Sequence, residues 1–204
     1  MAKLTQLFDS SKYEKRKTAD QEEFEKLHKR DFPMWKEIMH EAFKMTKEES
    51  SRKQPHFKDK NYHATVMSGN IQGLLKERFP NEVKIGAHDR LMFSRKGKYC
   101  IYFKKLDDRK MPNNVKTEYV ELIAYQKTIA GGDKMPIVFV GYCVDDEWFD
   151  LTGIYAVFID DNKRAWVSII DDNATGNSGG VSVIGNKPIA PIAPKSSRVR
   201  KKAE

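Results

Sequence analysis

One stretch of the chain decides the predicted fold, residues 83–141: VKIGAHDRLMFSRKGKYCIYFKKLDDRKMPNNVKTEYVELIAYQKTIAGGDKMPIVFVG. Its apolar runs and turn residues predict a short strand at 83–85, a β-hairpin at 89–106, a helix at 117–130 and a buried strand at 136–142. A helix between the hairpin and the last strand allows that strand to run parallel to a hairpin strand. The other segments are expected to pack against this block.

The hairpin is the clearest local pattern in this stretch. Two runs of bulky apolar residues flank a polar segment in which Gly97 suits a tight turn. With Lys96 and Gly97 as the central turn residues, Asp89 faces Lys104 across the two strands. Apolar side chains then lie on both faces of the hairpin, which predicts a sheet that is covered on both sides.

The composition is that of a water-soluble protein of 204 residues. No apolar run is long enough to cross a bilayer, and Met1 is not followed by a signal-peptide core. Cys100 and Cys143 both lie in apolar, strand-like runs, where two reduced core thiols are expected rather than a disulfide or a metal pair. These features predict a cytoplasmic protein without a membrane segment.

Charge is distributed unevenly along the chain, which has a net charge of +8. Residues 76–116 carry twelve Lys or Arg against five Asp or Glu, whereas residues 117–186 carry four against eleven. The last ten residues are basic again, with five Lys or Arg against one Glu. The sequence therefore predicts a basic first half of the core, an acidic second half and a basic tail.

The region 1–60 is highly charged and has helical periodicity. Thr18 is placed to cap a helix, and a broad apolar face around Trp35 is expected to dock on the core. The polar segment 48–60, which Pro55 interrupts, is predicted to be a loop. A further helix is predicted at 62–79, where Gly69 and Gly73 would allow close approach of a neighbouring element.

The second half of the core resembles a meander of strands joined by acidic turns. Strands are predicted near 148–151, 153–159 and 165–170, and the Asp pairs between them favour turns over cation sites. We expect an α+β fold with a mixed sheet built on the central hairpin and flanked by helices. The predicted organisation is a helical N-terminal region (1–60), a core domain (61–172) and a disordered basic tail (173–204).

The order helix, short strand, hairpin, helix, strand resembles the core of the PD-(D/E)XK nuclease superfamily. In that family an Asp on one hairpin strand and a Glu-x-Lys on the next converge on a divalent metal that activates water. The resemblance implies catalytic roles for Asp89, Lys104 and Gln126, with Glu77 as an auxiliary carboxylate and Mg²⁺ or Mn²⁺ as the metal.

The chain departs from the family pattern at Tyr102, which stands where the second carboxylate belongs. Glu118 or Glu121, on the following helix, is the expected replacement and would bind the metal together with Asp89. The structural alternative is that Asp89 is only a surface ion-pair partner of Lys104 or Arg90.

A second interpretation needs no catalysis. Basic residues of the hairpin and the following loop, interleaved with aromatic residues, are suited to neutralise phosphates and stack on bases. The structural alternative is a solvated turn whose aromatic residues belong to the core. The predicted contacts are Lys96, Lys98, Lys105, Arg109 and Lys110, with Arg198, Arg200, Lys201 and Lys202 of the tail as a mobile anchor.

A third interpretation uses the acidic residues of 145–172, which would dock on a basic protein surface, as phage or mobile-element inhibitors do. The five histidines are scattered, and the sequence contains no His-Glu-x-x-His, Cys-x-x-Cys or phosphate-binding glycine loop. We therefore predict a nucleic-acid-associated protein, binding DNA or RNA, with a degenerate nuclease-like core that is weak or inactive as an enzyme. The alternative is a protein-binding inhibitor or adaptor.

Overall fold

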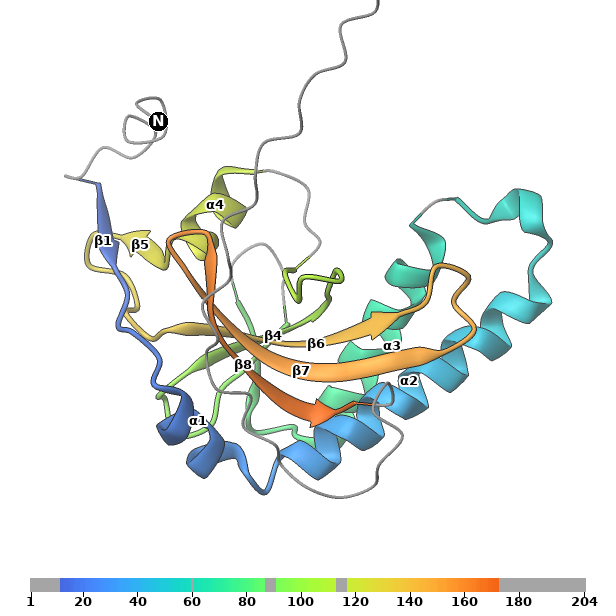
Figure 1. Cartoon of the computed structure of the whole chain (residues 1–204), viewed down its shortest axis with the longest axis horizontal. Helices are drawn as coiled ribbons and strands as arrows, with labels where there is room; N and C mark the ends of the chain where they lie inside the picture. Colours follow the sequence, from blue (N-terminus) through green and yellow to red (C-terminus); the bar gives the residue numbers. More distant parts are fainter. Residues whose placement is uncertain (1–11, 60, 87–90, 113–116, 173–204) are drawn as a thin grey trace, which may run out of the picture.

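The computed structural model describes residues 12–59, 61–86, 91–112 and 117–172. A sheet of six strands lies between helices (Figure 1). The helices are α1 (Gln21–His28), α2 (Phe32–Arg52), α3 (Tyr62–Arg78) and α4 (Glu118–Ala124), with a short 3₁₀ helix, η1 (Pro55–Phe57). The α+β class and the mixed sheet built on the hairpin are confirmed.

The large sheet has the strand order β2-β3-β4-β6-β7-β8. All neighbouring pairs are antiparallel except β4 and β6, which run parallel as predicted. The strands are β2 (Val83–Ile85), β3 (Leu91–Phe93), β4 (Cys100–Lys105), β6 (Ile137–Val144), β7 (Leu151–Asp160) and β8 (Lys163–Asp171). A separate two-stranded sheet pairs β1 (Tyr13–Lys15) with β5 (Lys127–Ile129).

Each face of the large sheet has its own apolar layer, as the two-sided hairpin predicts. On one face, side chains such as Val140 and Phe158 pack with Phe24 of α1, Trp35 of α2 and Leu75 of α3. The opposite face packs against α4 through Ile123 and against Leu106 at the end of β4. Because the first layer is shared, the N-terminal helices complete the core rather than stand apart from it.

The predicted hairpin register is wrong by one residue. Phe93 pairs with Ile101, whereas the predicted turn places Phe93 opposite Cys100. The observed pairing is centred on Gly97, and both Lys96 and Gly97 have positive φ, at 57° and 62°. A register shift of one residue changes which side chains of the two strands share a face. The predicted register, from which we inferred that Asp89 faces Lys104, is therefore not the observed one.

Two predicted elements after the hairpin are also wrong. The helix predicted at 117–130 ends at Ala124, and Gln126, with φ of 49°, turns the chain into β5. Of the strand predicted at 148–151, residues 148–150 instead lie in the turn between β6 and β7, where Trp148 has φ of 59°, and Leu151 begins β7. At the first of these places, the pairing of β5 with the distant β1 outweighs local propensity.

Three smaller expectations in the helical region change as well. Asp20, not Thr18, caps α1, accepting a hydrogen bond from the Glu23 backbone N–H at 2.8 Å. α2 continues to Arg52 through a segment predicted as loop. No atom lies within 4 Å of a Cβ built on Gly69 or Gly73, so these glycines do not mark a close approach within the described residues.

Candidate nucleic-acid interface

Tyr102 and Lys104 stand on β4 where the nuclease resemblance places a carboxylate and a lysine. The Tyr102 hydroxyl lies 3.2 Å from that of Tyr119 in α4, and the side chain is buried. Burial first, and the Tyr119 hydrogen bond second, raise the pKa of Tyr102, so its phenol stays neutral at physiological pH. A neutral phenol does not replace a carboxylate ligand, which leaves this position without a metal-binding group.

Gln126, predicted to be catalytic, has a different role in the structure. Its side chain is buried, and its amide nitrogen donates to the carbonyls of Ile137 at 2.9 Å and Ile159 at 2.8 Å. Its amide oxygen accepts from the Ile137 backbone N–H at 2.9 Å. Two of these bonds go to Ile137 at the start of β6 and one goes to Ile159 near the end of β7. The Gln126 amide therefore satisfies buried backbone groups and links the two strands.

Of the predicted metal ligands, only Glu121 has a described side chain. Glu121 is half-buried on α4. Asp89 and the side chain of Glu118 lie outside the described residues. Among the described residues no three His, Cys, Asp or Glu side chains are placed to hold a metal ion.

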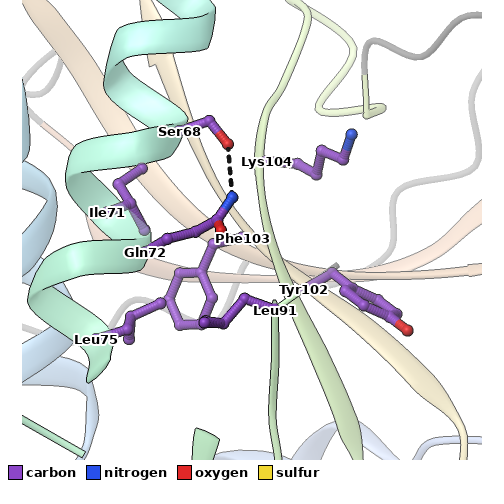
Figure 2. Close-up of a pocket in the computed structure, with 8 residues that line it drawn as sticks. All are labelled: Ser68, Ile71, Gln72, Leu75, Leu91, Tyr102, Phe103 and Lys104. Carbon is purple, nitrogen blue, oxygen red and sulfur yellow. Dashed lines mark hydrogen bonds between the residues drawn. The ribbon is translucent and has the colours of Figure 1, made fainter. Parts of the chain in front are cut away.

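A cavity of about 200 Å³ lies between α3 and β4 (Figure 2). The Phe103 ring points toward α3, and the Tyr102 side chain points to the other side of the strand. On α3, the Gln72 amide donates to the Ser68 hydroxyl at 3.3 Å. Lys104, half-buried, belongs to the lining of this cavity. The cavity thus combines an aromatic ring with amide and hydroxyl groups, while the Lys104 side chain points to the same side of the strand as Tyr102.

The predicted basic contacts of the hairpin are divided between the two ends of β4. Lys96 and Lys98 lie in the turn before it, where the Lys98 ammonium pairs with Glu23 of α1. Lys105, Arg109 and Lys110 lie at or beyond its other end. The hairpin therefore does not present one continuous basic surface. Arg198, Arg200, Lys201 and Lys202 lie outside the described residues.

Lys110 is engaged with the sheet rather than presented to a ligand. Its ammonium lies 3.4 Å from the Cys143 sulfur and 4.3 Å from the centre of the Tyr155 ring. Burial raises the pKa of the Cys143 thiol, so the thiol stays protonated beside this lysine. Arg109 is exposed, and its carbonyl accepts a hydrogen bond from Arg164 at 2.8 Å.

Lys105 is the predicted contact that lies within a cluster of aromatic groups. Its ammonium is 4.6 Å from the centre of the Trp148 ring, and His63 of α3 stacks on Trp148 with ring centres 5.3 Å apart. Trp148 lies in the turn between β6 and β7 and has a positive φ of 59°. Three segments far apart in the sequence thus meet at this end of the sheet.

His63 is held in its neutral form at this cluster. The Ser50 hydroxyl lies 2.7 Å from its Nε2 atom. Burial first, and then the positive charges of Lys58 and Lys105, hold the pKa of His63 below its ordinary value of 6.5.

More lysines and aromatic residues border this cluster. Lys47 donates to the Phe149 carbonyl at 2.9 Å, and the Phe149 side chain is 62% exposed. Lys53 lies over the Tyr62 ring at 4.8 Å. We call this set the aromatic–lysine surface: Lys47, Lys53, Lys58, Tyr62, His63, Lys105, Trp148 and Phe149.

Sequence reasoning found only Lys105 of this surface. Trp148 and Phe149 were predicted to lie in a strand, and Lys53 and Lys58 in a loop. The sequence signal that points to Trp148 is its place among four carboxylates, at 145–147 and 150, since such a cluster favours a turn. Asp146, Glu147 and Asp150 are exposed in that turn, so the surface is mixed in charge.

The acidic residues of 145–172 do not form one face. Asp160, at the end of β7, pairs with Lys15 at 3.0 Å. Asp171, at the end of β8, accepts from Lys36 at 2.9 Å and from His40 at 2.7 Å. Partial burial alone would raise the pKa of Asp171, but the bonds from His40 and Lys36 outweigh it and lower the pKa. Side chains of the N-terminal region therefore partner Asp160 and Asp171 of the predicted acidic half.

Comparisons with known proteins do not assign this chain to a family: no family model, curated protein or solved structure matches it. Among the described residues, none of the helices combines the length and apolar character that crossing a bilayer requires.

Proposed function

We propose that this protein binds nucleic acid through the aromatic–lysine surface, without relying on metal-dependent cleavage. The observation that carries the proposal is the placement of Lys105 over Trp148, beside His63. Lys58 lies near His63, and Lys47 and Lys53 contact the neighbouring Phe149 and Tyr62. Lysines that neutralise phosphates, next to rings on which bases stack, are the two elements of sequence-tolerant nucleic-acid binding.

Two features of the whole chain support the same proposal. The net charge of +8 favours association with a polyanion. The resemblance of the sequence to the nuclease superfamily, which rests on the order helix, strand, hairpin, helix, strand, also favours a nucleic-acid partner; in this chain the short strand β5 lies between α4 and β6. Tyr102, in place of a carboxylate, supports binding rather than catalysis as the activity.

The test measures binding of labelled DNA and RNA oligonucleotides by fluorescence anisotropy at about 50 and 200 mM salt. Affinity is expected to fall as salt rises, because each phosphate contact releases counterions. Lys105→Gln should weaken binding about fivefold at the lower salt concentration and reduce the salt dependence. Lys96→Gln, which removes an exposed lysine at the other end of β4, is the matched control.

Two further measurements, a cleavage assay and a truncated chain, test the nuclease alternative and the role of the basic tail. Incubation with Mg²⁺ or Mn²⁺ should leave the oligonucleotides intact, whereas cleavage that Asp89→Ala abolishes would establish the nuclease alternative. A chain that ends at Asp172 measures the share of the affinity that belongs to the basic tail. Absence of binding at both salt concentrations, or equal losses in the Lys105 and Lys96 variants, would refute the proposed surface.

A further inference from the structure

We infer that the nucleic acid bound here is single-stranded and that one unpaired base enters the cavity between α3 and β4. This inference rests on the proposed function and specifies its substrate. The cavity and the aromatic–lysine surface share β4, since Phe103 faces the cavity and Lys105 belongs to the surface. Alternate residues of a strand lie on one face about 7 Å apart. One extended strand can therefore place a base on Phe103 and its backbone near Lys105.

The size of the cavity suits a single flat group. Pockets for drug-sized ligands enclose about 300–1,000 Å³, whereas this cavity encloses about 200 Å³. Ile71 and Leu75 of α3 and Leu91 of β3 supply apolar, buried walls. The half-buried Phe103 ring offers a surface on which a base can stack.

The polar groups at the cavity are suited to the edge of a base. Gln72 uses one N–H to bond Ser68, and a primary amide has a second N–H and a carbonyl oxygen to offer. Ser68 is exposed and Gln72 is half-buried, so both can be reached from solvent (Figure 2).

A duplex fits this arrangement poorly for two reasons. A paired base has its hydrogen-bonding edge occupied and its faces stacked, so it must first leave the helix to enter a recess. The exposed carboxylates of Asp146, Glu147 and Asp150 would also repel the dense phosphates of a duplex. A base of a single strand does not have to leave a helix, and a single strand brings fewer phosphates near these carboxylates.

The experiment compares four probes by fluorescence anisotropy: a single-stranded DNA, an RNA of the same sequence, the corresponding DNA duplex, and an abasic single strand of equal length. The intact protein is expected to bind the two base-bearing single strands at least about tenfold more tightly than the duplex or the abasic strand. The abasic probe tests the role of the base without altering the protein.

A matched pair of variants then locates the base. Ser68→Tyr places a ring at the mouth of the cavity and should weaken single-strand binding about tenfold. Gly73→Tyr adds the same ring elsewhere on α3, where a Cβ meets no atom within 4 Å, and should leave affinity unchanged. Equal affinity for single strand, duplex and abasic strand, or an unchanged Ser68→Tyr affinity, would overturn the inference and leave the proposed function standing. If no probe binds, the proposed function fails as well.

Discussion

Asp31, between α1 and α2, is a carboxylate with an exposed fraction of only 3%. Its two oxygens contact the His28 ring at 2.8 Å and the Arg95 guanidinium at 3.0 Å, so it joins the helical region to the β3–β4 turn. Removing one partner of a buried ion pair leaves the other charge uncompensated. We expect Asp31→Asn to lower the free energy of unfolding in urea by about 3 kcal/mol.

The matched control for Asp31 is an exposed ion pair on the helices. Glu41 of α2 pairs with Arg78 of α3, and its side chain is 44% exposed. Solvent-exposed pairs contribute little, so Glu41→Gln should change the free energy of unfolding by less than about 1 kcal/mol. Equal effects of the two substitutions would show that burial does not make the Asp31 contacts special.

Gln126 provides the second prediction at the scale of single residues. Its amide makes three hydrogen bonds to the backbone of Ile137 and Ile159. Gln126→Leu leaves those buried groups without partners, which should cost about 3 kcal/mol of stability in urea unfolding. Gln72→Leu, which loses a single side-chain bond, should cost less than about 1 kcal/mol. If Gln126→Leu keeps its stability, the amide has a role other than the structural one described here.

Single elements carry the next prediction, which concerns α3. Gly69 and Gly73 lie within this helix, and a Cβ at either position meets no atom within 4 Å. Alanine restricts the unfolded chain and favours helix, so each Gly→Ala substitution should raise the free energy of unfolding by about 1 kcal/mol. At Gly141 of β6, by contrast, a Cβ would overlap the Leu106 side chain, and Gly141→Ala should destabilise the protein. Loss of stability at Gly69 or Gly73 would indicate packing that the structure does not show.

The elements also show what local sequence determines. The hairpin was predicted because apolar runs flank Gly97, and the helix at 62–79 because its periodicity ends before Pro80. The register was missed because the number of loop residues decides which side chains face each other, and composition does not reveal it. The strand β5 was missed because it is stabilised by β1, more than a hundred residues earlier in the chain.

At the scale of the whole molecule, charge segregation along the sequence does not persist in space. Lys98 and Arg95 of the basic half pair with Glu23 and Asp31 of the helical region. Lys15 pairs with Asp160 of the acidic half. Regional charge was therefore a poor guide to the candidate site, whereas the long-range contacts of Trp148 revealed it. Such contacts cannot be predicted from periodicity, because they depend on how the β6–β7 turn lies against α3.

The last prediction concerns the boundary near residue 60. Phe24 and Trp35 of the helical region share an apolar layer with Phe93, Val140 and Phe158 of the sheet. Removing the helical region would expose that layer to water at a cost of about 25 cal/mol per Å² of apolar surface. We therefore expect the described region to unfold as one cooperative unit and residues 61–172 alone not to fold.

Urea unfolding followed by tryptophan fluorescence and by far-UV circular dichroism tests this expectation. The tryptophans report on both parts, since Trp35 lies in α2 and Trp166 lies in β8. Coincident midpoints are expected from a single transition. Two separated transitions, or a cooperative transition in the isolated fragment 61–172, would mean that the sheet folds without the helical region. Ser50 and Lys47 belong to α2, and Lys53 caps its C-terminus. Either result would therefore also mean that the aromatic–lysine surface can be lost without unfolding the sheet.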